Sequence, residues 1–132
     1  MSAIAETLKT TQMNNTLLKL LKLAKMDEFL DTQGPFTIFA PNDEAFEELP
    51  EDLLNSLLKG ENLETVLNYH IVEDERTADD LRNIPSLETL GGEEILIDTL
   101  DDTIAVNDAA LIKEDIGYDN GIIQVIDSVL MP

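Results

Sequence analysis

The apolar residues of this chain change their spacing near residue 73. Before that point they recur every three or four residues, which is typical of amphipathic helices. After it they alternate with polar residues in short runs that Gly, Asp and Asn interrupt, which is typical of strands. Helices followed by strands predict an α+β fold, in which helices pack on mainly antiparallel strands. With 132 residues and only 6 Gly and 5 Pro, we expect residues 1–132 to form a single domain.

The first strong helical signal covers residues 13–25. Its apolar face consists of Met13, Leu17, Leu20, Leu21 and Ala24. Asn14 or Asn15 can cap the start of this helix. The lysines of its second half point outward, where positive charge suits the helix dipole.

Residues 36–40 (FTIFA) are bounded by Gly-Pro and by a second proline, and this pattern predicts a buried strand. A helix is expected to begin directly afterwards. Asn42 is its predicted N-cap, and Asp43 and Glu44 place negative charge in its first turn.

Two more helices precede the change of spacing. Pro50 fits the first helical position of one, whose leucine stripe (residues 53–58) can end at Gly60. Asn62 begins the other, which leads to Tyr69 and His70, where a strand is expected to start. Both the helical and the strand interpretation turn His70 inward or toward the boundary of the core.

The C-terminal half is predicted to be a β-meander. Strands are expected at 86–90, 94–100, 103–107, 110–116, 121–125 and 129–131, with turns at 91–92 and 101–102 and a loop at 117–120. We expect four side chains to lie in the core: Phe39, Phe46, Val125 and Ile126.

The charge distribution restricts the partners. The net charge is -20, and residues 26–132 carry -23 while residues 1–25 carry +3. An anionic body repels phosphate backbones and anionic lipid, so we expect no nucleic-acid partner and no binding to a membrane surface. The chain is expected to be a monomer. No apolar run approaches the roughly 20 residues that cross a bilayer, and the N-terminus lacks the pattern of a signal peptide. The acidity is interpreted as promoting solubility, with an acidic patch for cations or a basic partner as the alternative.

The sequence argues against catalysis. It has no Cys and one His, and it contains no nucleophile motif or glycine-rich phosphate loop. We therefore expect no enzyme activity, cofactor or metal, although a hydrolase built on a carboxylate pair stays open. Residues 115–121 fail the calcium-loop pattern, because Gly117 takes the third position and Ile126 the twelfth, and we interpret them as a turn. His70 is either a hydrogen-bonded lock of the helix-to-strand junction or a participant in binding.

Three segments lie in an order that points to a known family. They are residues 37–46 (TIFAPNDEAF), residues 69–70 (YH) and residues 120–130 (NGIIQVIDSVL). Together they resemble the two long motifs and the Tyr-His motif of the fasciclin domain family, over about residues 15–132. Asn42 stands where the family usually has Thr, and Gln124 where it often has His. A pH response that needs this second imidazole is therefore not expected here.

The resemblance implies a β-sandwich or wedge surrounded by helices, and a role in cell adhesion or matrix binding outside the cell. In some animal members the Tyr-His motif and its branched apolar neighbours are linked to integrin binding. The corresponding positions here are Leu67, Tyr69, His70, Ile71 and Val72. The receptor itself does not carry over, because a single acidic domain also resembles microbial secreted members.

These observations predict an extracellular or cell-surface adhesion module that binds a protein or polysaccharide. The expected contact surface combines the Tyr69–His70 junction with Asn42, Asp43 and Glu44. Two other classes remain: an acidic, cation-dependent ligand-binding domain and a structural spacer.

Overall fold

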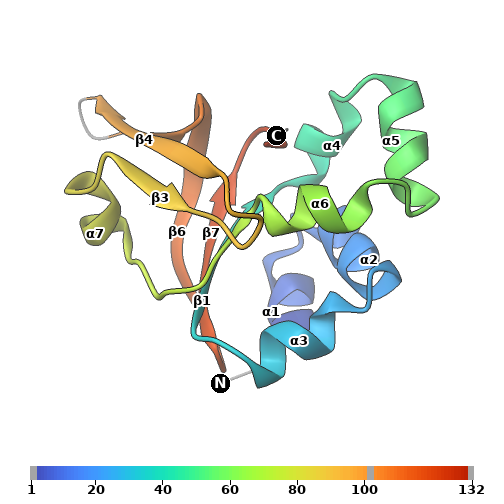
Figure 1. The fold of residues 1–132 in the computed structure, drawn as a ribbon, viewed down its shortest axis with the longest axis horizontal. Coiled ribbons are helices and arrows are strands. Elements are labelled where there is room, and N and C mark those ends of the chain that lie inside the picture. Colours follow the sequence, from blue (N-terminus) through green and yellow to red (C-terminus); the bar gives the residue numbers. More distant parts are fainter. Residues whose placement is uncertain (1–2, 101–102, 131–132) are drawn as a thin grey trace.

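The computed structural model describes residues 3–100 and 103–130. Its helices, labelled as in Figure 1, are α1 (Ile4–Thr11), α2 (Asn15–Leu23), α3 (Met26–Thr32), α4 (Asp43–Glu47), α5 (Glu51–Leu58), α6 (Leu63–Asn68) and α7 (Ala78–Arg82). Its strands are β1 (Phe36–Pro41), β2 (Ile71–Val72), β3 (Ser86–Glu88), β4 (Glu94–Leu100), β5 (Thr103–Val106), β6 (Ala109–Tyr118) and β7 (Gly121–Ile126). The predicted α+β fold is confirmed.

The strands form one wedge-shaped sheet in the order β2-β1-β7-β6-β5-β4-β3. All neighbours are antiparallel except β1 and β7, which run parallel from Phe36 opposite Gly121 to Pro41 opposite Ile126. Two segments about 85 residues apart in the sequence thus lie side by side inside the sheet. Both are buried along their full length, as expected for strands covered on both faces.

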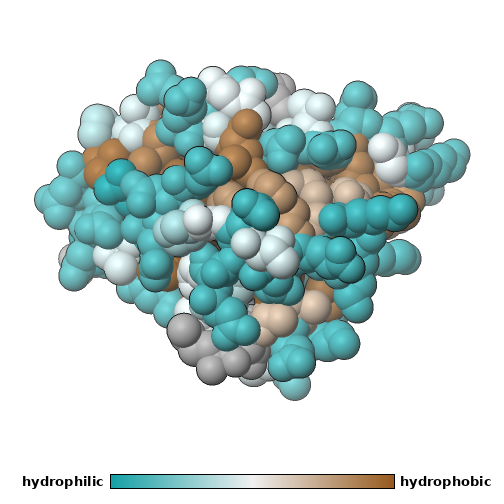
Figure 2. All heavy atoms as spheres, turned by 60° about the horizontal axis from the view of Figure 1, so that its bottom comes forward, coloured by the Kyte–Doolittle hydropathy of each residue, from teal (hydrophilic) through white to brown (hydrophobic). Residues whose placement is uncertain are grey.

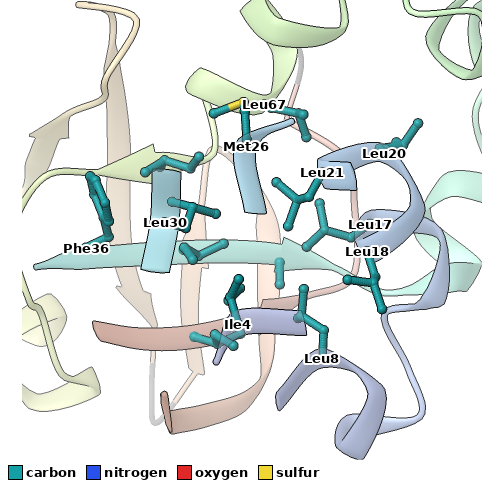
Figure 3. Packing of buried hydrophobic residues seen from close by; sticks show 14 of the residues in the cluster. Ile4, Leu8, Leu17, Leu18, Leu20, Leu21, Met26, Leu30, Phe36 and Leu67 are labelled. Atoms are coloured by element: carbon teal, nitrogen blue, oxygen red, sulfur yellow. The ribbon is translucent and has the colours of Figure 1, made fainter. Parts of the chain in front are cut away.

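Helices cover the two faces of this sheet unequally. Figure 1 shows α1 to α6 on one side of β1 and β7, whereas α7 lies on the other side. Alternate residues of a strand face opposite ways, so Ile38 packs into the core under the helices and Phe39 into the core among α7 and β3 to β6. Figure 3 shows side chains of α1, α2, α3 and α6 converging on β1 in the first core.

The four core predictions are confirmed. Phe39, Val125 and Ile126 have no exposed surface, and Phe46 is 2% exposed. They are divided between the two cores, with Phe46 and Val125 in the helical one. Truncating any of these side chains would therefore leave a cavity in a closely packed interior.

Hydrophilic side chains cover most of the face shown in Figure 2, with apolar side chains visible between them. Within residues 3–100 and 103–130, the recorded ion pairs are Arg76–Asp74, Arg82–Asp79 and Arg82–Glu114. Most of the carboxylates therefore face water without a cationic neighbour. In the same part of the chain, no helix is both long enough and apolar enough to cross a membrane.

Helix boundaries differ from the sequence prediction in two places. Pro50 is the N-cap of α5 with φ -52° and ψ 139°, one residue before the predicted position. Asn14 is the N-cap residue of α2, but its side chain makes no capping bond. It is buried and donates to the carbonyls of Ala40 and Pro41, at 3.3 and 2.8 Å. Asn14 thus takes the predicted N-cap position, but without the side-chain capping bond that was expected of it.

The C-terminal strands also differ. Gly117 and Tyr118, predicted as loop, extend β6, because the Tyr118 side chain is buried and its hydroxyl donates to the Leu30 carbonyl at 3.0 Å. Only Asp119 and Asn120 form the turn. No strand covers residues 127–130, and the predicted turn at 101–102 and Met131 lie outside the described residues.

Three helices had not been predicted: α1, α3 and α7. Each buries only two apolar side chains, which is too few for a repeated apolar stripe to stand out from the sequence, whereas α5 of similar length carries four leucines. The start of α7 nevertheless carries a signal, because Thr77 and Asp80 form a reciprocal capping box. Ala78 and Leu81 then anchor this short helix in the second core.

Candidate functional site

The turn from β1 into α4 is built as the sequence predicts. Asn42 has an extended backbone, and its side-chain oxygen accepts from the Ala45 N–H at 2.8 Å, which caps α4. Its own N–H donates to the Ile126 carbonyl at 3.0 Å. The Asn42 cap is thus confirmed, and the turn is tied to the end of β7.

Asp43 connects the same turn to α2. Its carboxylate accepts from the backbone N–H of Thr16 at 2.8 Å and from the Asn15 side chain at 3.2 Å. Thr16 lies in the first turn of α2. Asp43 therefore caps the N-terminus of α2, which the side chain of the N-cap residue Asn14 does not do. The Asp43 N–H donates to the Met13 carbonyl at 2.7 Å. This link between distant parts of the chain was missed by the sequence analysis.

A hollow of about 240 Å³ lies at this junction, and we call it the β1–α4 hollow. It is lined by Gln12, Met13, Asn42, Asp43 and Glu44. Glu44 and Gln12 are exposed, whereas Asn42 and Asp43 are only half-exposed because they are engaged in the bonds above. Among the described residues, nothing bonds the Glu44 carboxylate or the Gln12 amide, so the hollow offers these two groups and the Met13 thioether beside the hydrogen-bonded Asn42 and Asp43.

The Tyr-His junction has a different character, because its side chains are buried. His70 is 2% exposed and joins two distant segments. Its Nδ1 lies 2.8 Å from the Val66 carbonyl, and its Nε2 accepts from the Leu130 N–H at 2.8 Å. These partners fix the neutral tautomer with the proton on Nδ1. Burial lowers the pKa of His70 from 6.5 to about 4, although the bond to Val66 opposes this shift.

Tyr69 fixes the other side of the junction. Its hydroxyl donates to the Glu94 carbonyl at 3.3 Å and accepts from the Asn107 side chain at 2.8 Å. Asn107 in turn accepts from the Leu96 N–H at 2.7 Å. Tyr69 thereby attaches the end of α6 to the β4 and β5 strands.

The structure separates the eight predicted binding residues into two groups. Five lie in the interior with exposures between 1% and 7%: Leu67, Tyr69, His70, Ile71 and Val72. Only Asn42, Asp43 and Glu44 reach the surface. The predicted single surface does not form in this conformation, since burial leaves the first group almost no side-chain area for a partner. Binding by any of the eight residues stays a prediction.

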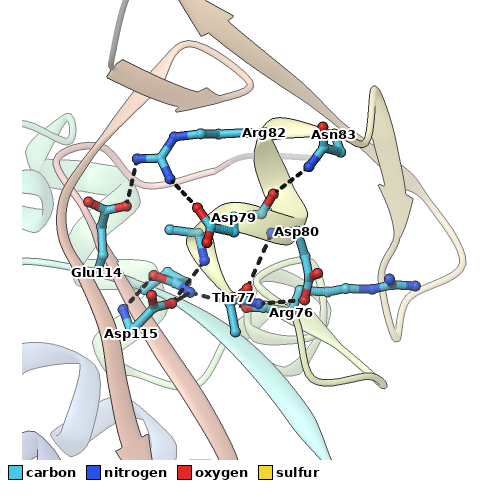
Figure 4. A network of polar contacts seen from close by, with 10 residues as sticks. Arg76, Thr77, Asp79, Asp80, Arg82, Asn83, Glu114 and Asp115 are labelled. Carbon is cyan, nitrogen blue, oxygen red and sulfur yellow. Dashed lines mark hydrogen bonds and ion pairs between the residues drawn. The ribbon is translucent and has the colours of Figure 1, made fainter.

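Gln124 occupies a buried polar site that the sequence did not reveal. Its side chain accepts from the Asp115 N–H at 2.9 Å and donates to the Asp115 carboxylate at 2.8 Å and to the Arg76 carbonyl at 3.1 Å. Asp115 also accepts from the Ala78 N–H at 2.9 Å. Asp115 adopts φ +55° within an irregularity of β6. Figure 4 shows Asp115 and Arg76 beside the start of α7. Through its bonds to these two residues, Gln124 connects the start of α7 to β6 and β7.

The predicted turn near residue 119 carries no cluster of metal ligands. The Asn120 side chain donates to the Gln33 carbonyl, which joins the turn to the end of α3. In the part of the chain that the structure describes, no three His, Cys, Asp or Glu side chains gather in a way that could hold a metal ion. The described carboxylates therefore offer no preformed site for a hard cation.

Comparison with known proteins shows which family this chain resembles in sequence and structure. The sequence pattern described as "Fasciclin domain" matches residues 12–132. The chain is similar to two Synechocystis proteins. It is 38% identical to protein sll1483 over 121 residues, which cover 89% of this chain and 67% of that protein. It is 35% identical to protein sll1735 over 132 residues, which cover 99% and 98%.

Two further similar proteins are described as a cell surface protein and a cell adhesion molecule. Cell surface glycolipoprotein MPB83 of Mycobacterium bovis is 31% identical over 100 residues, which cover 75% of this chain and 44% of that protein. A solved structure of a FAS1 domain pair from the insect cell adhesion molecule fasciclin I superposes with a TM-score of 0.86 at 22% identity, covering 99% of this chain and 51% of that one. The chain belongs to the fasciclin domain family.

Proposed function

We propose that this chain is a non-enzymatic adhesion module that works at the cell surface or outside the cell. Two relatives support this class, since one is a cell adhesion molecule and another a cell surface glycolipoprotein. The one histidine of the chain, His70, is also buried with both ring nitrogens bonded to backbone groups, so it is not free to act as a general base. The partner is a protein or a polysaccharide, and it is bound at the surface.

The contact site of this proposal is the β1–α4 hollow. The observation that carries it is the double anchoring of the turn, through Asn42 to β7 and through Asp43 to α2. Because the β1–α4 turn is held at both of these points before binding, it loses little conformational entropy when a partner binds. It also leaves Glu44 and Gln12 free to contact a partner, because neither side chain has a recorded hydrogen bond among the described residues.

Adhesion of the immobilised protein to cells or matrix of its source organism tests this proposal. Glu44→Ala and Gln12→Ala are expected to weaken adhesion because both side chains line the hollow. Glu47→Ala is the matched control, since Glu47 lies in the same helix and is exposed but does not line the hollow. Circular dichroism of each variant checks that the fold is intact.

The results of these adhesion measurements distinguish an adhesion module from a cation-dependent ligand-binding domain and from a structural spacer. Adhesion that persists in Glu44→Ala and Gln12→Ala rejects the hollow as the contact site. Adhesion abolished by a chelator favours a cation-dependent ligand-binding domain. A parent protein that adheres to no cell or matrix sample favours a structural spacer.

A further inference from the structure

The two end strands of the sheet, β2 and β3, approach each other at one point. The Leu90 N–H, just after β3, donates to the Ile71 carbonyl of β2 at 2.8 Å. Following the pairings around the sheet shows that β2 and β3 run in opposite directions. This bond is therefore placed like the first rung of an antiparallel ladder that would close the sheet.

In the part of the chain that the structure describes, no strand pairs with the outer edge of β3, so further backbone groups on this edge lack a partner strand. The Thr89 N–H donates to the Glu93 carbonyl, and the Ile97 N–H donates to the Pro85 carbonyl. The backbone N–H and C=O groups of odd-numbered residues in and beside β3 therefore point toward β4. Backbone groups alternate in direction along a strand. The N–H and C=O groups of Ser86 and Glu88 therefore point away from β4, toward the open edge, as the N–H of Leu90 does.

A groove of about 460 Å³ opens between the two edges beside this single rung. Its lining residues are Val72, Glu73, Asp74, Arg76, Leu87, Glu88, Thr89, Leu90 and Gly92. Val72 and Leu87 are buried and apolar, and Glu73, Asp74 and Glu88 are exposed. The groove thus combines an apolar base, an acidic rim and free backbone groups along one side.

The charges around the groove favour one kind of occupant. The one basic residue of its lining, Arg76, is bound by Asp74 at 2.7 Å, which leaves Glu73 and Glu88 without a recorded ion pair among the described residues. Basic side chains would complement this rim. A second copy of this chain is disfavoured, because its net charge of -20 would be repelled.

We propose that the groove between β2 and β3 binds an extended, basic segment of a partner protein by strand addition. The backbone of the segment bonds to the N–H and C=O groups of Ser86 and Glu88. Its alternate side chains face the apolar base at Val72 and Leu87, or the carboxylates of Glu73 and Glu88. This surface is distinct from the β1–α4 hollow and does not depend on the function proposed for the hollow.

A synthetic peptide tests the proposal with the complete chain. The probe is the capped octapeptide Lys-Thr-Lys-Val-Lys-Thr-Lys-Val. A control peptide of the same sequence carries N-methyl groups on alternate residues, which removes backbone donors but keeps every charge. We expect the probe to bind, to slow the amide exchange of Ser86 and Glu88, and to bind at least about tenfold more tightly than the N-methylated control.

Charge reversal provides a second readout. Glu73→Lys combined with Glu88→Lys is expected to weaken probe binding about tenfold. Asp52→Lys combined with Glu61→Lys changes the net charge equally at exposed positions outside the groove, and is expected to change binding less than about twofold.

Three results would overturn the proposal. The first is no binding of the probe to the parent protein. The second is equal binding of the N-methylated peptide, which would show that backbone bonding is not used. The third is equal weakening by the two double variants, which would show diffuse attraction to an anionic body. Adhesion measured with Glu44→Ala reports on the other surface, so failure of one proposal can be told from failure of the other.

Discussion

At the scale of single residues, buried or half-exposed polar side chains bond to backbone groups far away in the sequence. His70 joins α6 to the segment after β7, and Asp43 joins the β1–α4 turn to α2. In both cases the residue type could be read from the sequence, whereas the partner could not. Replacing such a side chain leaves a backbone group unpaired, which costs more than the loss of an average exposed contact.

His70 makes stability depend on pH. The unfolded chain takes up the imidazole proton near pH 6.5, whereas the folded protein resists protonation down to about pH 4. This contribution to stability is complete above pH 6.5 and is lost as the pH falls toward 4, by on the order of 3 kcal/mol in total. Urea denaturation of parent protein and His70→Gln between pH 7.5 and about 4.5 measures it. The parent should lose more stability than the variant, and equal losses would contradict the assignment.

Asp43 is expected to stabilise α2 as a cap supplied by another element. Asp43→Ala should lower the free energy of unfolding by about 1 to 2 kcal/mol, because the Thr16 N–H loses its acceptor. Asp43→Asn should lie between parent and Ala, since an amide oxygen still accepts this bond. Chemical denaturation provides the values, with Glu47→Ala expected to change stability by less than about 0.5 kcal/mol. An Ala variant as stable as the parent would show that α2 needs no cap.

At the scale of elements, the parallel pair β1 and β7 organises the fold. These strands come from different halves of the chain, and each contributes side chains to both cores. Both long motifs of the family resemblance fall on this pair and the segments that follow it. Their residues thus serve packing and backbone pairing, whereas few of them reach the surface.

Gly121 permits the close approach at the start of this pair. A Cβ added there would lie 2.0 Å from the carbonyl oxygen of Phe36, which is a backbone atom that no side-chain rotation can move. Gly121→Ala is therefore expected to cost more than about 3 kcal/mol or to prevent folding. Gly91→Ala is the control, because its Cβ would meet only ordinary contacts from 3.7 Å, with an expected change within about 1 kcal/mol. Thermal unfolding compares them, and similar midpoints would refute the steric argument.

At the scale of the whole molecule, the charge is the dominant feature. The net charge is -20, and the recorded ion pairs of the described residues involve only Arg76 and Arg82. Mutual repulsion among carboxylates opposes the compact state. The fold must therefore depend on its two apolar cores and its buried polar links, and not on surface ion pairs.

Added salt should consequently stabilise the protein. Raising sodium chloride from about 20 to 500 mM shortens the range of the repulsion and should raise the unfolding temperature. A variant combining Glu47→Gln, Glu48→Gln, Asp52→Asn and Glu61→Gln removes four exposed charges and should show a smaller rise. Scanning calorimetry measures both. An unfolding temperature that does not change with salt in the parent would show that repulsion contributes little.

Local patterns in the sequence were enough for several features. The periodicity predicted α2, α5 and α6, the Gly-Pro and Pro boundaries predicted β1, and the position of Asn42 predicted the cap of α4. Alternation predicted β3 to β7 with small errors at their ends. These succeed because helix stripes, caps and strand alternation depend on residues close together in the chain.

Other features arose only when distant segments met. The parallel pairing of β1 with β7, the capping of α2 by Asp43 and the clamp of Gln124 on Asp115 each join residues from different elements, and no local pattern encodes their partners. Contacts between distant segments also explain why five of the eight residues predicted to bind a partner are buried. Sequence alone determined the family and the types of residues at the Tyr-His junction, but tertiary packing placed Leu67, Tyr69, His70, Ile71 and Val72 inside, because burying their apolar surface and pairing their polar atoms stabilises the fold.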